Sequence, residues 1–141
     1  MLALDDPRIL HMLLSYERFF GQPLASPNEL FEAPFAVLAH GIEPSPILFY
    51  GNRLALELWE MDFDTFTQMP SLRTAEPDLR EGRAALLDEV ARSGFSRGYR
   101  GARVSSTGRR FEILHAKVWN ILDPRGVRLG QAATFAEYAW I

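Results

Sequence analysis

Residues 34–63 read PFAVLAHGIEPSPILFYGNRLALELWEMDF, and this stretch determines the fold that the sequence predicts. It holds two short apolar runs, 35–39 and 47–50, separated by a turn segment that contains glycine and proline. After Asn52 the apolar residues change from an unbroken run to helical spacing. The stretch therefore predicts two strands and a short helix, with Asn52 as the cap of that helix.

Upstream of this stretch, Asp6 followed by Pro7 is a typical helix start, and Gly21 is a typical stop. The sequence thus predicts a helix over 7–20 whose apolar residues are wider than one core-facing stripe. Two interpretations stay open: the helix lies on the sheet of its own chain, or it also packs on a second copy in a homodimer. The interface candidates for the homodimer are Ile9, Leu13, Tyr16 and Phe20.

Downstream, the pattern predicts a short helix capped by Asp62 or Asp64 and a longer helix over 79–93 that Asp78 opens. After residue 94 the apolar period changes to two, which predicts three strands joined by hairpins, over 95–105, 109–122 and 127–138. The expected fold class is α+β, with a five-stranded antiparallel sheet in which the first strand pair lies beside the last strand. The middle helices are expected on one face of the sheet and the N-terminal helix on the other.

Length and composition predict one globular domain. The 141 residues divide into an N-terminal helix with its connector over 1–29 and the main domain over 30–141, and 48% of the residues are hydrophobic. Fifteen Lys and Arg against 18 Asp and Glu give a net charge of −3, which argues against a nucleic-acid partner. No apolar run approaches the ~18–20 residues of a membrane span, and the acidic start predicts no signal peptide. A cytoplasmic location without membrane contact is therefore expected.

The segment PILFYGNRLALELWEMDFDTFTQMPS, over 46–71, resembles the opening of a PAS domain. Residues 34–62, PSLRTAEP over 70–77, GYRGARVSSTGRRFEI over 98–113, VWNILD over 118–123 and GQAATF over 130–135 are together similar to the MEKHLA family. That family is PAS-related, and the resemblance covers about residues 30–140. It implies a five-stranded PAS-like fold and a sensory or interaction role, but no established activity or ligand.

The resemblance to PAS domains also bears on a flavin cofactor. The light-sensing LOV branch needs a cysteine at the place that matches Ser71, and the chain has no cysteine, so a cysteinyl-flavin adduct is excluded. The LOV positions that hold flavin-binding asparagines match Arg103 and Ile113 here. A flavin is therefore disfavoured, and the ligand is left unassigned.

A candidate ligand site follows from strand parity. Period two puts His115 and Lys117 on the same face as Ile113, and the LOV comparison turns that face toward the ligand cradle. With Arg103 on the neighbouring strand, these cations predict a site for a carboxylate or another anion. The alternative is that Lys117 and Arg103 are solvated and that His115 is an ordinary sheet residue. The full candidate pocket is Tyr50, Asn52, Trp59, Arg103, Ile113, His115, Lys117 and Thr134.

Other chemistry finds little support in the sequence. The three histidines, His11, His40 and His115, lie on three different predicted elements, so haem and a dedicated metal site are disfavoured. No motif of a nucleophile, a zinc hydrolase or a phosphate-binding loop is present.

Three functional hypotheses remain. The preferred one is a non-catalytic sensory module that binds a small molecule or a signalling protein and forms a homodimer. The second is a ligand-free structural domain that acts through protein contacts. The third and least favoured is a small cone-fold enzyme, such as an isomerase or cyclase, which requires a buried acid or histidine with a shifted pKa.

Overall fold

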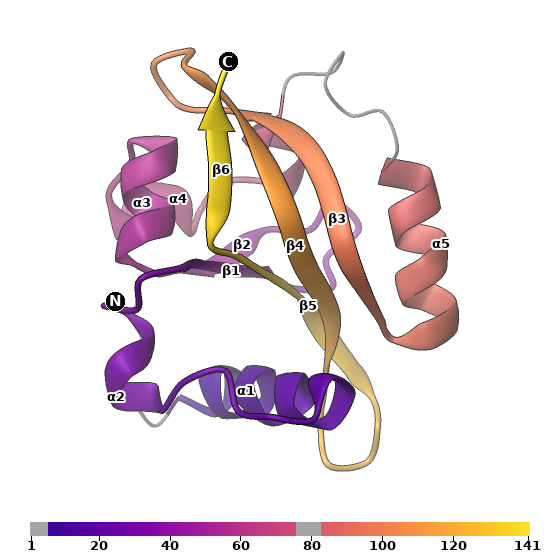
Figure 1. Cartoon of the computed structure of the whole chain (residues 1–141). Helices are drawn as coiled ribbons and strands as arrows, with labels where there is room; N and C mark the ends of the chain where they lie inside the picture. The colour runs from indigo at the N-terminus through magenta and orange to yellow at the C-terminus, as the bar shows by residue number, and fades with distance from the viewer. Residues whose placement is uncertain (1–5, 76–82) are drawn as a thin grey trace.

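The computed structural model describes residues 6–75 and 83–141. The order of elements along the chain confirms the predicted α+β arrangement (Figure 1). The predicted helix start at Asp78 and Leu79 lies outside the described residues. Within the described ranges, none of the helices combines the length and the apolar character that crossing a membrane requires. The elements are α1 (Pro7–Phe20), α2 (Pro27–Leu30), β1 (Ala36–His40), β2 (Leu48–Gly51), α3 (Arg53–Trp59), α4 (Phe63–Phe66), a 3-10 turn (Ser71–Thr74), α5 (Arg83–Ser93), β3 (Phe95–Val104), β4 (Arg110–Leu122), β5 (Arg128–Phe135) and β6 (Glu137–Trp140).

The sheet has the strand order β2-β1-β5-β4-β3, and every pairing is antiparallel. The predicted position of the first strand pair beside the last long strand is therefore confirmed. The predicted strand over 127–138 is corrected, because it divides into β5 and β6 at Ala136. Both parts pair with the same strand, β4, so the sheet gains a sixth short strand.

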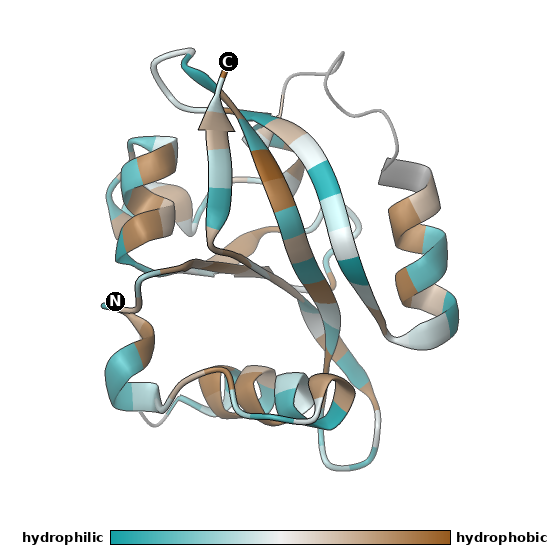
Figure 2. Cartoon of the chain, in the orientation of Figure 1, coloured by the Kyte–Doolittle hydropathy of each residue, from teal (hydrophilic) through white to brown (hydrophobic). Residues whose placement is uncertain are grey.

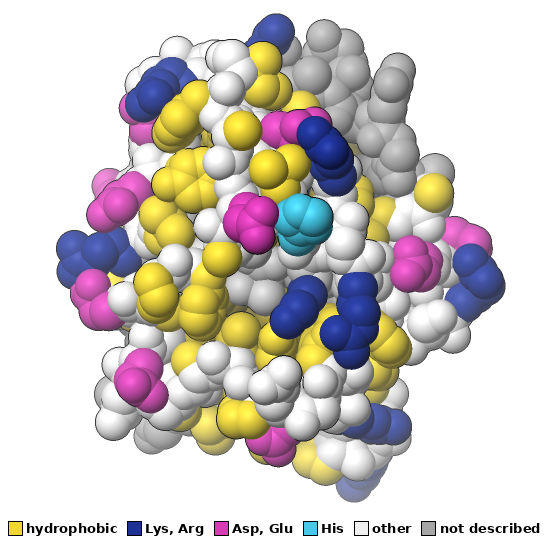
Figure 3. Space-filling view, in the orientation of Figure 1, with side chains coloured by type: hydrophobic (Ala, Val, Ile, Leu, Met, Phe, Trp, Pro, Cys, Tyr) yellow, Lys and Arg dark blue, Asp and Glu magenta, His cyan; other side chains and the backbone are white. Residues whose placement is uncertain are grey.

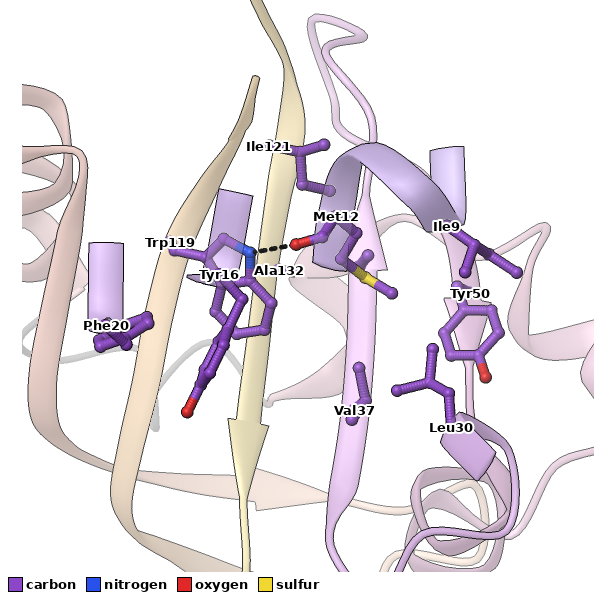
Figure 4. Close-up of a cluster of buried hydrophobic side chains, with 11 residues drawn as sticks. Ile9, Met12, Tyr16, Phe20, Leu30, Val37, Tyr50, Trp119, Ile121 and Ala132 are labelled. Carbon is purple, nitrogen blue, oxygen red and sulfur yellow. Dashed lines mark hydrogen bonds between the residues drawn. The ribbon is translucent and has the colours of Figure 1, made fainter. Parts of the chain in front are cut away.

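Helix α1 lies across one face of the sheet, which we call the outer face (Figure 1). Figure 2 shows hydrophobic and hydrophilic residues alternating around this helix. Its N-cap is Asp6, whose side chain accepts a hydrogen bond from the backbone N–H of Arg8, and Gly21 ends it with φ of 80°. Figure 4 shows its side chains meeting those of β1, β2, β4 and β5 in one core. The residues of this core are Ile9, Met12, Tyr16, Phe20, Leu30, Val37, Ala39, Tyr50, Trp119, Ile121 and Ala132.

This packing decides between the two interpretations of α1. Ile9, Tyr16 and Phe20 are buried against their own sheet, and Leu13 packs on the same core. The proposed dimer-interface residues are thus corrected to core residues, because the sheet offers them an apolar surface within the chain. The large apolar residues of the helix that point outward are Leu10 and Leu14, which are 40% and 63% exposed. Homodimerisation stays a prediction, without these four residues as its contacts.

The opposite face of the sheet, which we call the inner face, is covered by α3, α4 and α5. Trp59 of α3 is fully buried at its centre, with Phe111 of β4 in edge contact at a ring-centroid distance of 5.1 Å. Helix α5 packs separately, through Leu86 and Val90 against Val118. The inner face therefore has two neighbouring apolar clusters, and the space between them is where a ligand site is to be sought.

Candidate functional site

A small cavity lies between the inner face of the sheet and the helices that cover it. Its volume is about 60 Å³. Aromatic and aliphatic side chains from β1, β2, α3, α5, β4 and β5 form most of its wall. The apolar residues are Leu38, Ala39, Leu48, Trp59, Leu86, Ile113, Ala116, Val118, Ala132, Ala133 and Phe135, and the polar lining consists of His40, Ser71, Thr74, Tyr99, Arg103 and Gln131.

The cation of this cavity is Arg103 on β3. Its guanidinium donates to the backbone oxygen of Ala102 at 2.8 Å and to the hydroxyl of Tyr99 at 3.2 Å. Both side chains fold over Gly101, where an added Cβ would lie 2.5 Å from the Tyr99 hydroxyl and 2.9 Å from Nη1 of Arg103. The backbone of β3 is irregular on either side of Tyr99, and the bulge aims Tyr99 and Arg103 at the inner face. The bulge and Gly101 together place the guanidinium of Arg103 in the wall of the cavity.

Three of the candidate pocket residues meet at this cavity: Trp59, Arg103 and Ile113. Asn52 and Tyr50 do not. Asn52 is fully buried behind α3 as its N-cap, and Tyr50 belongs to the core under α1, where burial raises the pKa of its phenol. Neither side chain lines the cavity, because Asn52 is engaged by four backbone groups and Tyr50 points to the outer face.

The predicted parity of β4 fails at His115. His115 has φ of 53°, in the left-handed region, so the strand gains a residue between its inner-face positions Ile113 and Ala116. Below this point Lys117 and Trp119 face α1 rather than the cavity. The predicted common face of Ile113, His115 and Lys117 is thus wrong, and the backbone at His115 is the physical reason.

Strand β5–β6 changes face at the same level. Phe135 and Tyr138 both pack on the inner cluster although they are three residues apart. The register with β4 nevertheless continues, since Lys117 pairs with Thr134 and Leu114 pairs with Glu137. The two strands therefore shift together at His115 and Ala136, which keeps their hydrogen bonding while it swaps their faces.

His115, Lys117 and Thr134 line a separate groove on the outer face, with a volume of about 350 Å³. Lys117 Nζ donates to the hydroxyl of Tyr16 at 3.0 Å, and Nε2 of His115 lies 3.7 Å from a carboxylate oxygen of Glu137. Figure 3 shows acidic, basic and histidine side chains together on this face. The groove therefore holds the Glu137 carboxylate beside His115 and Lys117, and Arg103 does not line it.

A substitution at His115 tests the backbone explanation of the face change. We expect His115→Val to lower the free energy of unfolding by about 1–2 kcal/mol, since a β-branched residue disfavours the left-handed region. His115→Gly should leave stability within about 0.5 kcal/mol, because the exposed imidazole contributes little packing. Urea unfolding measures both. Equal losses in the two variants would show that the side chain, not the backbone, sets the cost.

The candidate pocket drawn from the sequence missed five polar residues of the cavity wall: His40, Ser71, Thr74, Tyr99 and Gln131. Gln131 of β5 pairs with His40 of β1, and both residues line the cavity. The alternation of faces along β5 was the sequence signal that could have assigned Gln131 to the inner face. Among the described residues, no group of three or more His, Asp or Glu side chains is arranged to hold a metal ion.

Comparison with known proteins places this geometry in a family. The model of the MEKHLA domain matches residues 8–140. No curated protein matches the chain. Three solved structures similar to it share its fold at 10–12% sequence identity, which supports the fold and not the function.

These structures illustrate the likeness. A PAS domain of a protein from Colwellia psychrerythraea has a TM-score of 0.67 at 12% identity, covering 81% of this chain and 92% of that one. A Light-Oxygen-Voltage domain studied with a flavin analogue has a TM-score of 0.65 at 10% identity, with 82% and 83% covered. An RNA-binding Light-Oxygen-Voltage receptor has a TM-score of 0.63 at 10% identity, with 76% and 30% covered.

Proposed function

The chain belongs to the MEKHLA domain family, and from this premise we propose that it is a sensory module that binds a small ligand at its inner-face cavity. The observation that carries the proposal is the guanidinium of Arg103 in the wall of that cavity, bonded only to two neutral oxygens within the described residues. Arg103 is half-buried, and a cation in a cavity wall whose described hydrogen bonds reach no carboxylate favours an external anionic group.

The size of the cavity limits the ligand. Pockets for drug-sized molecules measure roughly 300–1,000 Å³, whereas this cavity measures about 60 Å³. A ring system such as the flavin of light-sensing domains does not fit among these residues, and the chain has no cysteine for an adduct. The ligand that suits the cavity is small or slender.

The same small volume favours a second candidate, a ligand-free domain that acts through protein contacts. Trp59, Phe111 and Phe135 are all buried and pack in one cluster beneath the helices. An enzymatic role has less support, because no carboxylate is present among the described residues that line the cavity. The two leading candidates differ in whether any small molecule binds there.

A cavity-filling variant separates them. Ala116 is 2% exposed and lines the cavity, so Ala116→Leu should fill it at a cost of about 1–3 kcal/mol in stability. We expect at least one small metabolite in a mixed panel to raise the melting temperature of the wild type and not that of Ala116→Leu. The matched control is Ala139→Leu, on exposed β6, which should respond like the wild type. Compounds that stabilise no variant, or all three equally, would favour the ligand-free domain.

A further inference from the structure

Strand β6 has one edge that no other strand in the described part of the chain covers. It pairs with β4 alone, whereas β5 just before it lies between β4 and β1 (Figure 1). The backbone N–H of Ile141 donates to the oxygen of Arg110 at 3.0 Å. Because backbone groups alternate in direction along a strand, those of Ile141 and of every second residue before it point toward β4, and those of Tyr138 and Trp140 point outward.

The other two edges of the sheet are protected. The edge of β2 is covered where the backbone N–H of Leu48 donates to the oxygen of Met69 at 3.0 Å. Strand β3 has two register shifts and carries three arginines among its ten residues, and bulges and charges of this kind discourage pairing. Strand β6 has neither device, since its pairing with β4 is regular and its one charged residue is Glu137 at the first position. It is therefore the edge open to another strand.

The side chains of β6 differ between the two faces of the sheet. Tyr138 and Trp140 lie on the inner face, where their rings meet that of Phe111 at centroid distances of 6.5 and 5.6 Å. The guanidinium of Arg109 lies over the ring of Trp140 at 3.8 Å, which orders this 46% exposed side chain. Ala139 takes the outer face and is exposed. The strand thus has an ordered aromatic pair on one face and a small residue on the other.

This edge is complementary to itself. In an antiparallel pair of two β6 strands with a two-fold axis at Ala139, Tyr138 lies opposite Trp140 of the partner subunit, and the outward backbone groups of both strands bond to one another. We propose that β6 pairs with β6 of a second copy in this register, so that one sheet runs through a homodimer. The small side chains of the two alanines meet on the axis, and each outward aromatic residue gains a cross-strand ring partner.

The charges at the two ends of β6 favour the same arrangement. Ile141 lies beside Arg110 within each copy, so the antiparallel pair brings the Glu137 end of one strand to the end of the other that carries Arg109 and Arg110. A parallel pair would instead set like charges side by side. Opposite charges therefore support a second copy in antiparallel orientation as the occupant of this edge. The inference goes beyond the proposed function, because it needs no ligand in the cavity.

The test places charges on the two-fold axis. Ala139→Lys and Ala139→Glu each set two like charges face to face in the pair, whereas a mixture of the two variants sets opposite charges against each other. Ala139 does not line the cavity, and urea unfolding verifies that both variants are folded. The matched control is Leu14→Lys with Leu14→Glu, because Leu14 is 63% exposed on α1, the other helix or strand considered for dimer contacts. Sedimentation equilibrium of the full chain measures each dissociation constant.

We expect the wild type to dimerise weakly, with a Kd on the order of 100 µM, because one strand pair buries less surface than a standard interface. Each Ala139 variant alone should dimerise at least about fivefold more weakly than the wild type. The mixture should form a mixed dimer at least about tenfold more tightly than either variant binds itself. The Leu14 variants, alone or mixed, should match the wild type.

Three results would overturn the inference. The first is a wild type that stays monomeric up to about 1 mM, tenfold above the expected Kd. The second is an Ala139 variant that dimerises as tightly as the wild type, or a mixture that recovers no dimer. The third is self-association that the Leu14 variants lose and the Ala139 variants keep, which assigns the dimer contact to α1. Each of these results leaves the proposed ligand at the inner-face cavity intact, since the melting-temperature comparison with Ala116→Leu tests it separately.

Discussion

Asn52→Ala is expected to lower the free energy of unfolding by about 3–4 kcal/mol, although Asn52 contacts no solvent and lies outside the cavity. Its Oδ1 accepts from the backbone N–H of Val37 at 2.9 Å and of Ala55 at 3.3 Å. Its Nδ2 donates to the backbone oxygens of Leu30 at 3.2 Å and Phe35 at 2.7 Å. One side chain thus ties α2, β1 and α3 together, and alanine leaves four buried backbone groups without it.

The measurement is urea unfolding of the variant beside two controls. Asn52→Asp preserves the shape but replaces the two N–H donors with an oxygen that faces carbonyl oxygens, so we expect a loss at least as large. Asn28→Ala, at an exposed position of α2, should change stability by no more than about 0.5 kcal/mol. If Asn52→Asp were as stable as the wild type, packing and not hydrogen bonding would explain the role of Asn52.

Asn52 was predictable from the sequence because its signal is local. A polar residue between an apolar run and a helical pattern is a cap wherever the rest of the chain goes. The same holds for Asp6 and for Asp62, whose side chain accepts from the backbone N–H of Thr65 at 2.7 Å. The strand order also followed from the sequence, with the family resemblance, because three hairpin-linked strands leave the first pair few places to join.

The site was less predictable because its wall depends on backbone irregularities. Period two assigns the residues of β4 to faces only while the strand is regular, and one left-handed residue, His115, reverses the assignment. The hydrophobic pattern does not reveal this reversal, since below His115 both faces of β4 are covered and both Val118 and Trp119 are buried. Trp59 and Arg103 were correctly grouped, whereas Lys117 was assigned to the wrong face.

The packing of α1 was also left open by the sequence. Helix α1 was expected either to lie on its own sheet or to pack on a second copy, because sequence alone does not reveal how much of a helix its sheet covers. Ile9, Tyr16 and Phe20 share one side of the helix and pack in the core on the outer face, as Figure 4 shows. Leu10 and Leu14 are 40% and 63% exposed, so part of the wide apolar surface lies outside that core.

Trp119→Ala is expected to cost about 3–5 kcal/mol in unfolding free energy, the range for large aromatic residues removed from a core. Trp119 is fully buried, meets the rings of Tyr16 and Phe20 at centroid distances of 5.0 and 6.1 Å, and donates its indole N–H to the backbone oxygen of Met12 at 3.0 Å. The matched control is Trp140→Ala, because Trp140 is 46% exposed, and its loss should cost about 1 kcal/mol or less.

The position of Trp119 also predicts where the damage appears. All three of its aromatic and hydrogen-bond contacts belong to α1, so the variant should release α1 before it disturbs the inner face. Hydrogen exchange should therefore accelerate in the amides of α1 more than in those of α3, which packs around Trp59 on the opposite side. Trp119→Phe, which keeps a ring and loses the indole N–H, should fall between the wild type and alanine. Equal acceleration of exchange in α1 and α3 would mean that the two faces of the sheet unfold as one unit, and that Trp119 supports the whole domain rather than the docking of its first helix.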